Sequence, residues 1–366
     1  MGYLNKQNRL IVKKILLNLI LIASIVASCE RDYGKQTIVE ELVDVELQVT
    51  TPSIEASRGE ASGLDSALGA IDNFNNNSEL WELYDLRYIL EIYEVIKEGT
   101  GATISENPIY KRQVLTTDNY DAESVSFKMQ VVPNRTYIFV VWADFVEEDE
   151  AEDLYYDTTD LRAISRKASY AHKAMEEALD AYHICATETI KSAANINLTL
   201  TRPMAKLRVV AIDYDEISNY AQPTSVSVKF DTENNPVYKS FNAVTSEIFD
   251  NCPAHEYAYS IDPMPYQEYS STTATGESLT GVVLFSDYIF TPRDIATLEK
   301  NEYPVSFSMT IFYDNSEEIN RVIDFDTQIP LSRNYLTTLV GNCLTQKEDF
   351  VVEINDTLLM GEEITN

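Results

Sequence analysis

Short stretches that alternate apolar and polar residues constrain this chain most strongly. In residues 42–51, valine or leucine at every second position alternates with acidic and amide side chains. This period of two is typical of a strand with one buried face. Residues 86–93, rich in aromatic and β-branched types, fit a pleated surface equally well. Further strands are predicted at 125–132, 136–141, 196–200, 206–212, 225–230, 280–285, 305–313, 322–325 and 350–354.

One stretch has a different period. Between residues 161 and 191, apolar residues recur every third or fourth position, which predicts a helical insertion. Many short strands separated by turn signals favour β-sandwiches. We therefore predict a mainly β chain with an N-terminal β-sandwich over 42–200, which contains the helical insertion at about 161–191. A C-terminal β-sandwich follows over 201–366.

The charge balance narrows the classes of partner. The 366 residues include 59 acidic and 28 basic side chains, a formal net charge of −31. With 45% apolar residues the chain can still bury a core. Nucleic-acid binding needs clustered Lys and Arg, so we expect no nucleic-acid partner. Only 11 glycines leave little material for phosphate-binding loops.

The first 28 residues have the pattern of a signal peptide. They carry four basic and no acidic side chains, and their apolar stretch, 15–27, is shorter than the roughly 20 residues that span a bilayer. The segment Val26–Cys29 resembles a bacterial lipoprotein lipobox, which implies cleavage between Ser28 and Cys29 and lipidation of Cys29, with palmitate among its acyl chains. The alternative is an ordinary signal peptide with a chance cysteine. Residues 29–41 are predicted to be a tether.

No motif selects a catalytic or metal site. The chain contains no phosphate-binding glycine motif, zinc-protease histidine motif or serine nucleophile elbow. Its three histidines are not spaced as metal ligands, and its acids are too many to single out a catalytic pair, although a carboxylate-dependent glycoside hydrolase stays open. We expect no enzyme activity, no cofactor and no metal. After lipidation three cysteines, Cys185, Cys252 and Cys343, allow at most one disulfide.

Tyrosines leave two interpretations open. The chain has 23 of them, and their rings could stack on sugars or pack between strands. We favour packing. The residues concerned are Tyr137, Tyr155, Tyr156, Tyr257, Tyr259, Tyr266 and Tyr269.

Three segments together resemble a known family. Residues 202–209 are similar to the start of the second domain in Bacteroidales fimbrillin-like, type V pilin-related surface lipoproteins. Residues 330–345 with 351–354 resemble the carboxy-terminal signature of these proteins, and 137–144 with 155–157 resemble a fimbrillin-related domain. The resemblance implies two tandem transthyretin-like β-sandwiches, lipid-anchored at the outer membrane and cell surface as part of a fimbrium.

The resemblance also implies a mode of assembly. In this family a protease cuts after an arginine that follows the first strand, and a strand from another subunit fills the groove. The matching residue is Arg58, and the implied partners are other fimbrial subunits. Only twelve residues, 355–366, follow the last predicted strand, which is short for a donor strand. The alternative is a non-polymerising surface lipoprotein that binds glycans or host proteins.

Overall fold

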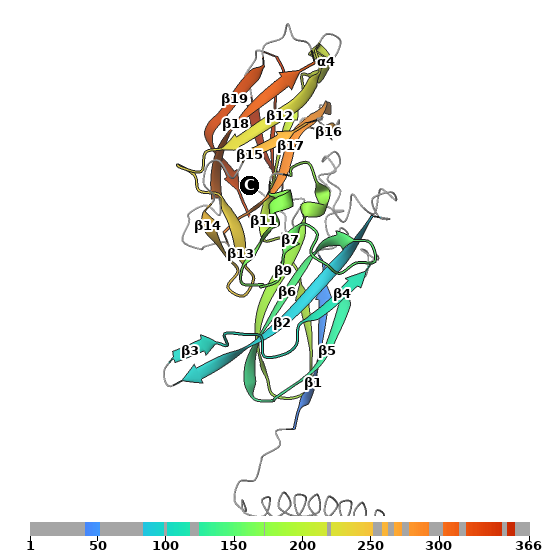
Figure 1. Cartoon of the computed structure of the whole chain (residues 1–366), viewed down its shortest axis with the longest axis vertical. Helices are drawn as coiled ribbons and strands as arrows, with labels where there is room; N and C mark the ends of the chain where they lie inside the picture. Colours follow the sequence, from blue (N-terminus) through green and yellow to red (C-terminus); the bar gives the residue numbers. More distant parts are fainter. Residues whose placement is uncertain are drawn as a thin grey trace, which may run out of the picture. The chain divides into compact units, whose positions relative to one another are not determined.

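The computed structural model shows a chain that is nearly all β (Figure 1). It describes residues 41–51, 83–98, 101–117, 124–171, 173–217, 221–251, 258–262, 267–272, 278–292, 303–314, 320–345 and 350–355. Val43–Asn366 makes one compact unit, separate from Met1–Leu42. The prediction of a mainly β chain is confirmed.

The first part of this unit is built from two sheets around one core. One sheet has the order β10-β1-β5, and the other has the order β3-β2-β6-β9, with β4 also paired to β2. Residues from both sheets, such as Leu47 and Phe139, share the same hydrophobic cluster. The bounds are β1 Val43–Thr50, β2 Tyr84–Glu98, β3 Gly101–Ile104, β4 Gln113–Thr117, β5 Val125–Val131, β6 Arg135–Glu147, β9 Ala181–Ile190 and β10 Ala194–Thr199.

The second part repeats this plan. Its sheets have the orders β16-β17-β11-β20-β21 and β15-β12-β18-β19, and Leu207 and Met309 belong to the core between them. A short helix, α4 (Tyr214–Ile217), follows the first strand. The bounds are β11 Met204–Ala211, β12 Pro223–Phe230, β15 Ala258–Ile261, β16 Glu268–Thr272, β17 Ser278–Phe290, β18 Tyr303–Tyr313, β19 Arg321–Leu331, β20 Leu336–Gly341 and β21 Phe350–Asn355.

The order of the central strands is the same in both parts, although the sheet that contains β1 has three strands and the one that contains β11 has five. β1 pairs parallel with β10 and antiparallel with β5, and β11 pairs parallel with β20 and antiparallel with β17. In the facing sheets, β2-β6-β9 and β12-β18-β19 are both antiparallel series. β1 and β11 are therefore equivalent first strands. The predicted boundary at residue 201 and the transthyretin likeness stay predictions.

A further sheet, β14-β13-β8-β7, joins strands from the two parts. It consists of β7 (Tyr156–Asp157), β8 (Ile164–Arg166), β13 (Tyr238–Asn242) and β14 (Glu247–Asn251). β8 and β13 pair antiparallel, and Arg166 on β8 donates to the buried Asp287 carboxylate on β17 at 2.6 Å. These contacts connect segments that lie on either side of residue 201.

The predicted helical insertion at 161–191 is wrong. This segment contains β8, two single 3₁₀ turns, η2 (Ala168–Tyr170) and η3 (Glu177–Leu179), and then the ten-residue strand β9. The apolar spacing has another cause: Leu179 is buried in a turn, whereas Tyr182 is buried in a strand paired with β6. Pairing with a central strand overrode the local period, as tertiary context commonly does.

Candidate strand-exchange site

The first strand, β1, lies between two partners. Its residues Val45–Thr50 pair parallel with Ala194–Thr199 of β10, and Val43–Val49 pair antiparallel with Val131–Val125 of β5. Both edges of β1 therefore contribute backbone hydrogen bonds to the sheet. The predicted strand at 42–51 is confirmed, and the structure adds its two neighbours.

Apolar side chains on one face of β1 enter the core. Val45, Leu47 and Val49 are buried and belong to the hydrophobic cluster that β2, β6 and β9 complete. Burying a side chain of this size contributes about 1.5–3 kcal/mol. The alternation of apolar and polar residues in β1 therefore places three side chains in the core, and their burial holds the strand in the sheet.

The outward face of β1 is polar and paired across the strands. The Asp44 carboxylate accepts a hydrogen bond from Gln130 Nε2 at 2.9 Å, and Glu46 accepts one from Ser126 Oγ at 2.6 Å. The Ser126 hydroxyl, followed by the Lys128 ammonium, lowers the pKa of Glu46. Such exposed pairs add little stability, but they favour one register of β1 against β5.

Loss of β1 would create a groove. β5 and β10 would each be left with an unpaired edge, separated by about two strand spacings, or roughly 9–10 Å. The floor of the groove would be the apolar surface that Val45, Leu47 and Val49 now cover. One extended segment with alternating apolar side chains could fill that space, because it would restore both the ladder bonds and the burial.

The sequence-predicted processing residues lie outside the described residues. Ser28 and Cys29 belong to the undescribed stretch 1–40, and Arg58 belongs to 52–82. Signal cleavage, lipidation and maturation at these residues therefore stay predictions. Within the described part of the chain, no helix is long and apolar enough to cross a bilayer.

The cysteines within the described ranges are not paired with each other. Cys185 Sγ donates to the Val244 carbonyl at 3.1 Å, and Cys343 is buried with its Sγ 3.6 Å from the Val210 carbonyl. Burial raises the pKa of the Cys343 thiol. Cys252 lies outside the described residues. Over the ranges that the structure describes, no group of three or more His, Cys, Asp or Glu side chains could hold a metal ion.

The tyrosines singled out in the sequence are core groups wherever the structure describes them. Packing in the core, the interpretation that we favoured, is confirmed for the five described tyrosines. Their rings are too buried to stack on a sugar. Tyr257 and Tyr266 lie outside the described residues. The buried members are Tyr137, Tyr155, Tyr156, Tyr259 and Tyr269.

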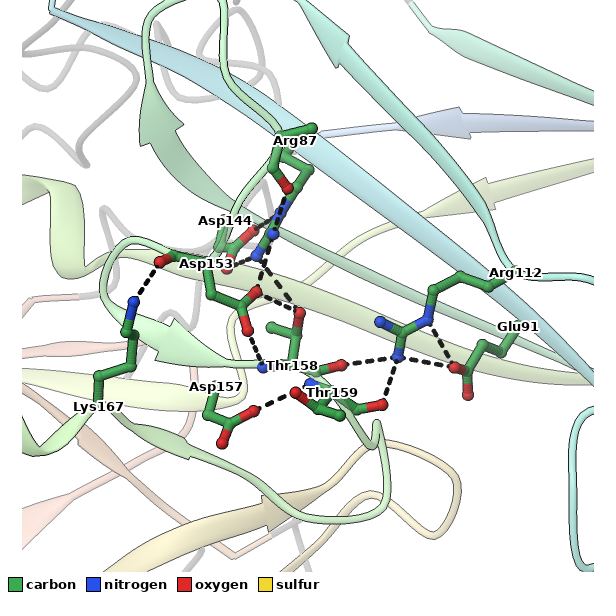
Figure 2. A network of polar contacts seen from close by, with 10 residues as sticks. Arg87, Glu91, Arg112, Asp144, Asp153, Asp157, Thr158, Thr159 and Lys167 are labelled. Carbon is green, nitrogen blue, oxygen red and sulfur yellow. Dashed lines mark hydrogen bonds and ion pairs between the residues drawn. The ribbon is translucent and has the colours of Figure 1, made fainter.

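A buried ion pair braces the sheet that faces β1 (Figure 2). Arg87 on β2 donates to both carboxylate oxygens of Asp144 on β6, at 2.9 and 2.7 Å, and both residues are almost fully buried. Arg87 also pairs with Asp153 at 2.9 Å. Burial raises the pKa of Asp144, and the nearby Arg87 guanidinium offsets part of that rise.

The same network fixes the acidic loop that follows β6. Asp153 accepts hydrogen bonds from the amide and hydroxyl of Thr158, at 2.8 and 2.6 Å, and Lys167 Nζ donates to the Asp153 carbonyl (Figure 2). Arg112 links Glu91 on β2 with the Thr158 carbonyl. Sequence reasoning missed this network. The available signal was the presence of charged residues inside the apolar run at 86–93, where strand burial would demand partners.

Comparison with solved structures gives similarities at low sequence identity. A candidate adhesin from Bacteroides thetaiotaomicron is 10% identical, with a TM-score of 0.41 over 87% of this chain and 98% of that chain. A candidate polysaccharide-binding protein from the same species is 9% identical, with a TM-score of 0.40 over 88% and 99%. A C-terminally truncated tip fimbrial protein from Porphyromonas gingivalis is 12% identical, with a TM-score of 0.36 over 86% and 99%.

Comparison with curated proteins gives no match. One family model spans nearly all of the chain, because it matches residues 36–363. That range includes β1 and every other strand described above. The chain therefore belongs to the family of unknown function DUF6562.

Proposed function

We propose that this chain is a fimbrial subunit or fimbrillin-like adhesive protein of the cell surface, assembled by β-strand complementation. The observation that carries the proposal is the position of β1, a first strand held along both edges and anchored by three buried side chains. The proposed role is structural and adhesive rather than catalytic. Its partners are other fimbrial subunits, and before cleavage a lipid on Cys29 anchors the precursor in the outer membrane.

The physical argument is that another strand can replace β1 with little change in free energy. Unpaired backbone groups and an exposed apolar groove are unfavourable in water. A sheet that has lost β1 therefore favours binding of an extended segment that restores the backbone bonds and the burial. A strand from a second subunit would make bonds of the same kind. Cleavage after Arg58, which follows β1 in the chain, would separate the strand from the rest of the protein.

Expression of the full-length chain in a native host tests this assembly. We expect surface fractions to contain heat-labile ladders, and Arg58→Ala to abolish them. Arg31→Ala is the matched control. Arg31 precedes β1, so a cut at that residue would leave β1 attached to the rest of the protein. Ladders that survive Arg58→Ala, or only monomer in the unmodified protein, would contradict strand complementation.

The lipid anchor is tested separately. Cys29→Ala should abolish fatty-acid incorporation and, in the uncleaved Arg58→Ala background, release the protein from membrane fractions. Retention in the membrane by the variant would show that another feature anchors the chain.

A further inference from the structure

The two strands that flank β1 present hydrogen-bond donors on the solvent side of their sheet. Their solvent-facing side chains carry hydroxyl, ammonium or amide groups. Neither strand contains an acidic residue, although acidic side chains outnumber basic ones by 59 to 28 in the whole chain. A strand that lies between β5 and β10 therefore meets donors on both sides. The solvent-facing residues are Ser126, Lys128 and Gln130 of β5 and Asn195, Asn197 and Thr199 of β10.

β1 places two carboxylates among these donors. Glu46 is opposite Lys128 in the register with β5, and its Oε1 lies 3.6 Å from Lys128 Nζ. The same Oε1 accepts a hydrogen bond from Ser126 Oγ at 2.6 Å. One pair further along, Asp44 Oδ1 accepts a hydrogen bond from Gln130 Nε2 at 2.9 Å. The acidic residues of β1 thus contact side chains that can donate to them.

The space around these carboxylates does not select side chains by size. A hollow of about 750 Å³ lies beside them, and its lining includes Asp44, Glu46, Lys128, Gln130 and Asn195. A longer side chain at the position of either carboxylate would extend into this hollow. The charge and the hydrogen-bonding groups of a strand at these two positions, rather than its side-chain length, therefore decide how well it fits.

We propose that the groove left by β1 selects its incoming strand by charge, and that the strand which fills it carries acidic side chains opposite Lys128 and Gln130. This inference rests on the proposed strand complementation and adds the chemical nature of the partner segment. Alternating apolar side chains are common to half-buried strands, so they select a partner poorly on their own. Opposite charges directly across two strands stabilise the pair, whereas like charges destabilise it.

The equivalent first strand of the second part shows what this groove would reject. β11 buries alternate apolar residues, as β1 does, but it carries Lys206 and Arg208 on the opposite face. Lys206 Nζ donates to Glu177 at 2.6 Å, and Arg208 Nε donates to Thr338 Oγ1 at 3.3 Å. A strand of this kind in the place of β1 would bring a cation close to Lys128. Charge therefore distinguishes two strands whose apolar patterns are similar.

The test measures competition between two differently labelled peptides for the full-length protein. One peptide has the sequence of residues 42–51, and the other has the same sequence with Glu46→Lys. Both peptides must displace the same resident strand, so the ratio of their uptake depends only on how each one fits the groove. We expect the unmodified protein to take up the first peptide about three to ten times more than the second.

A change on the other side of the pair should reverse this preference. The Lys128→Glu protein should take up the Glu46→Lys peptide in preference to the first peptide, because the two charges have been exchanged. Lys97→Glu is the matched control, since Lys97 is an exposed residue of β2, outside the sheet of β1, and the net charge changes equally. This control should keep the preference of the unmodified protein. Added salt should bring the ratio closer to one, because it screens the exposed pair.

The outcomes separate this inference from strand complementation itself. Equal uptake of the two peptides by the unmodified protein, or the same preference in the Lys128→Glu protein, would overturn charge selection and leave strand complementation in place. A preference that Lys97→Glu abolishes would also overturn it, because the effect would then come from net charge alone. Uptake of neither peptide would contradict strand complementation, and this inference with it.

Discussion

Replacing Leu47 with alanine tests whether buried side chains hold β1 in place. Leu47 is 0% exposed at the middle of the strand, and it is aligned with Phe127 on β5 and Ile196 on β10. A leucine-to-alanine change at such a core site removes the apolar transfer energy and leaves a cavity. The free energy of unfolding should therefore fall by about 2–5 kcal/mol.

The neighbouring residue supplies the matched control. Gln48 lies on the polar face of β1 and is half-buried, so Gln48→Ala should change the free energy of unfolding by about 0.5 kcal/mol or less. Urea denaturation followed by tryptophan fluorescence measures both, because Trp142 is fully buried in the same core. A labelled peptide with the sequence of residues 42–51 should also exchange more readily into the Leu47→Ala protein.

Equal unfolding energies for the two variants would refute the reasoning. In that case β1 would be held by its backbone bonds alone, and the groove would give an incoming strand no side-chain energy. A peptide that exchanges equally into both proteins would lead to the same conclusion. Strand complementation would then lose the observation on which it rests.

Two further outcomes concern the sheet that faces β1. Arg87→Met should lower the free energy of unfolding, measured in urea, by about 3–5 kcal/mol, because the buried Asp144 carboxylate loses its two nitrogen donors. The double variant Arg87→Met with Asp144→Leu should recover most of that loss. If the losses of the two single variants simply add in the double variant, the expectation is contradicted. Burial raises the pKa of Tyr88 from 10 to about 12, so the folded chain keeps a proton that the unfolded chain loses, and stability should decline as the pH rises through this window. Tyr88→Phe should reduce that decline by about 2–3 kcal/mol at pH 12, measured by urea denaturation at each pH, and an unchanged decline would show that Tyr88 does not contribute.

The sequence predicted strands best where one face is buried and the other is solvated. In β1 the alternation of valine and leucine with polar residues follows the alternation of burial in the structure. β9 gave no such signal, because its first three residues, Ala181–His183, are all buried and the strand is covered on both faces there. Without alternation, a few alanines at helical spacing suggested a helix.

The neighbours of a strand were harder to predict than the strand itself. The pairing of Thr50 with Thr199 joins residues that are 149 positions apart in the chain, and no local pattern encodes such a contact. The Arg87–Asp144 pair was hidden for the same reason, since each residue alone is a charge inside an apolar strand. The processing residues Cys29 and Arg58 were accessible only through resemblance, because their roles depend on enzymes outside this chain.

The repeated strand order explains why the first half is the better candidate for exchange. β1 and β11 hold equivalent positions, but their parallel partners differ. β20, the partner of β11, also pairs with β21 on its other edge. β10, the partner of β1, pairs within the described residues with β1 alone. Loss of β11 would leave β20 paired with β21, whereas loss of β1 would leave β10 without a partner among the strands that the structure describes. Binding of a replacement strand is therefore most favourable at the position of β1, because it would restore backbone bonds to both β5 and β10.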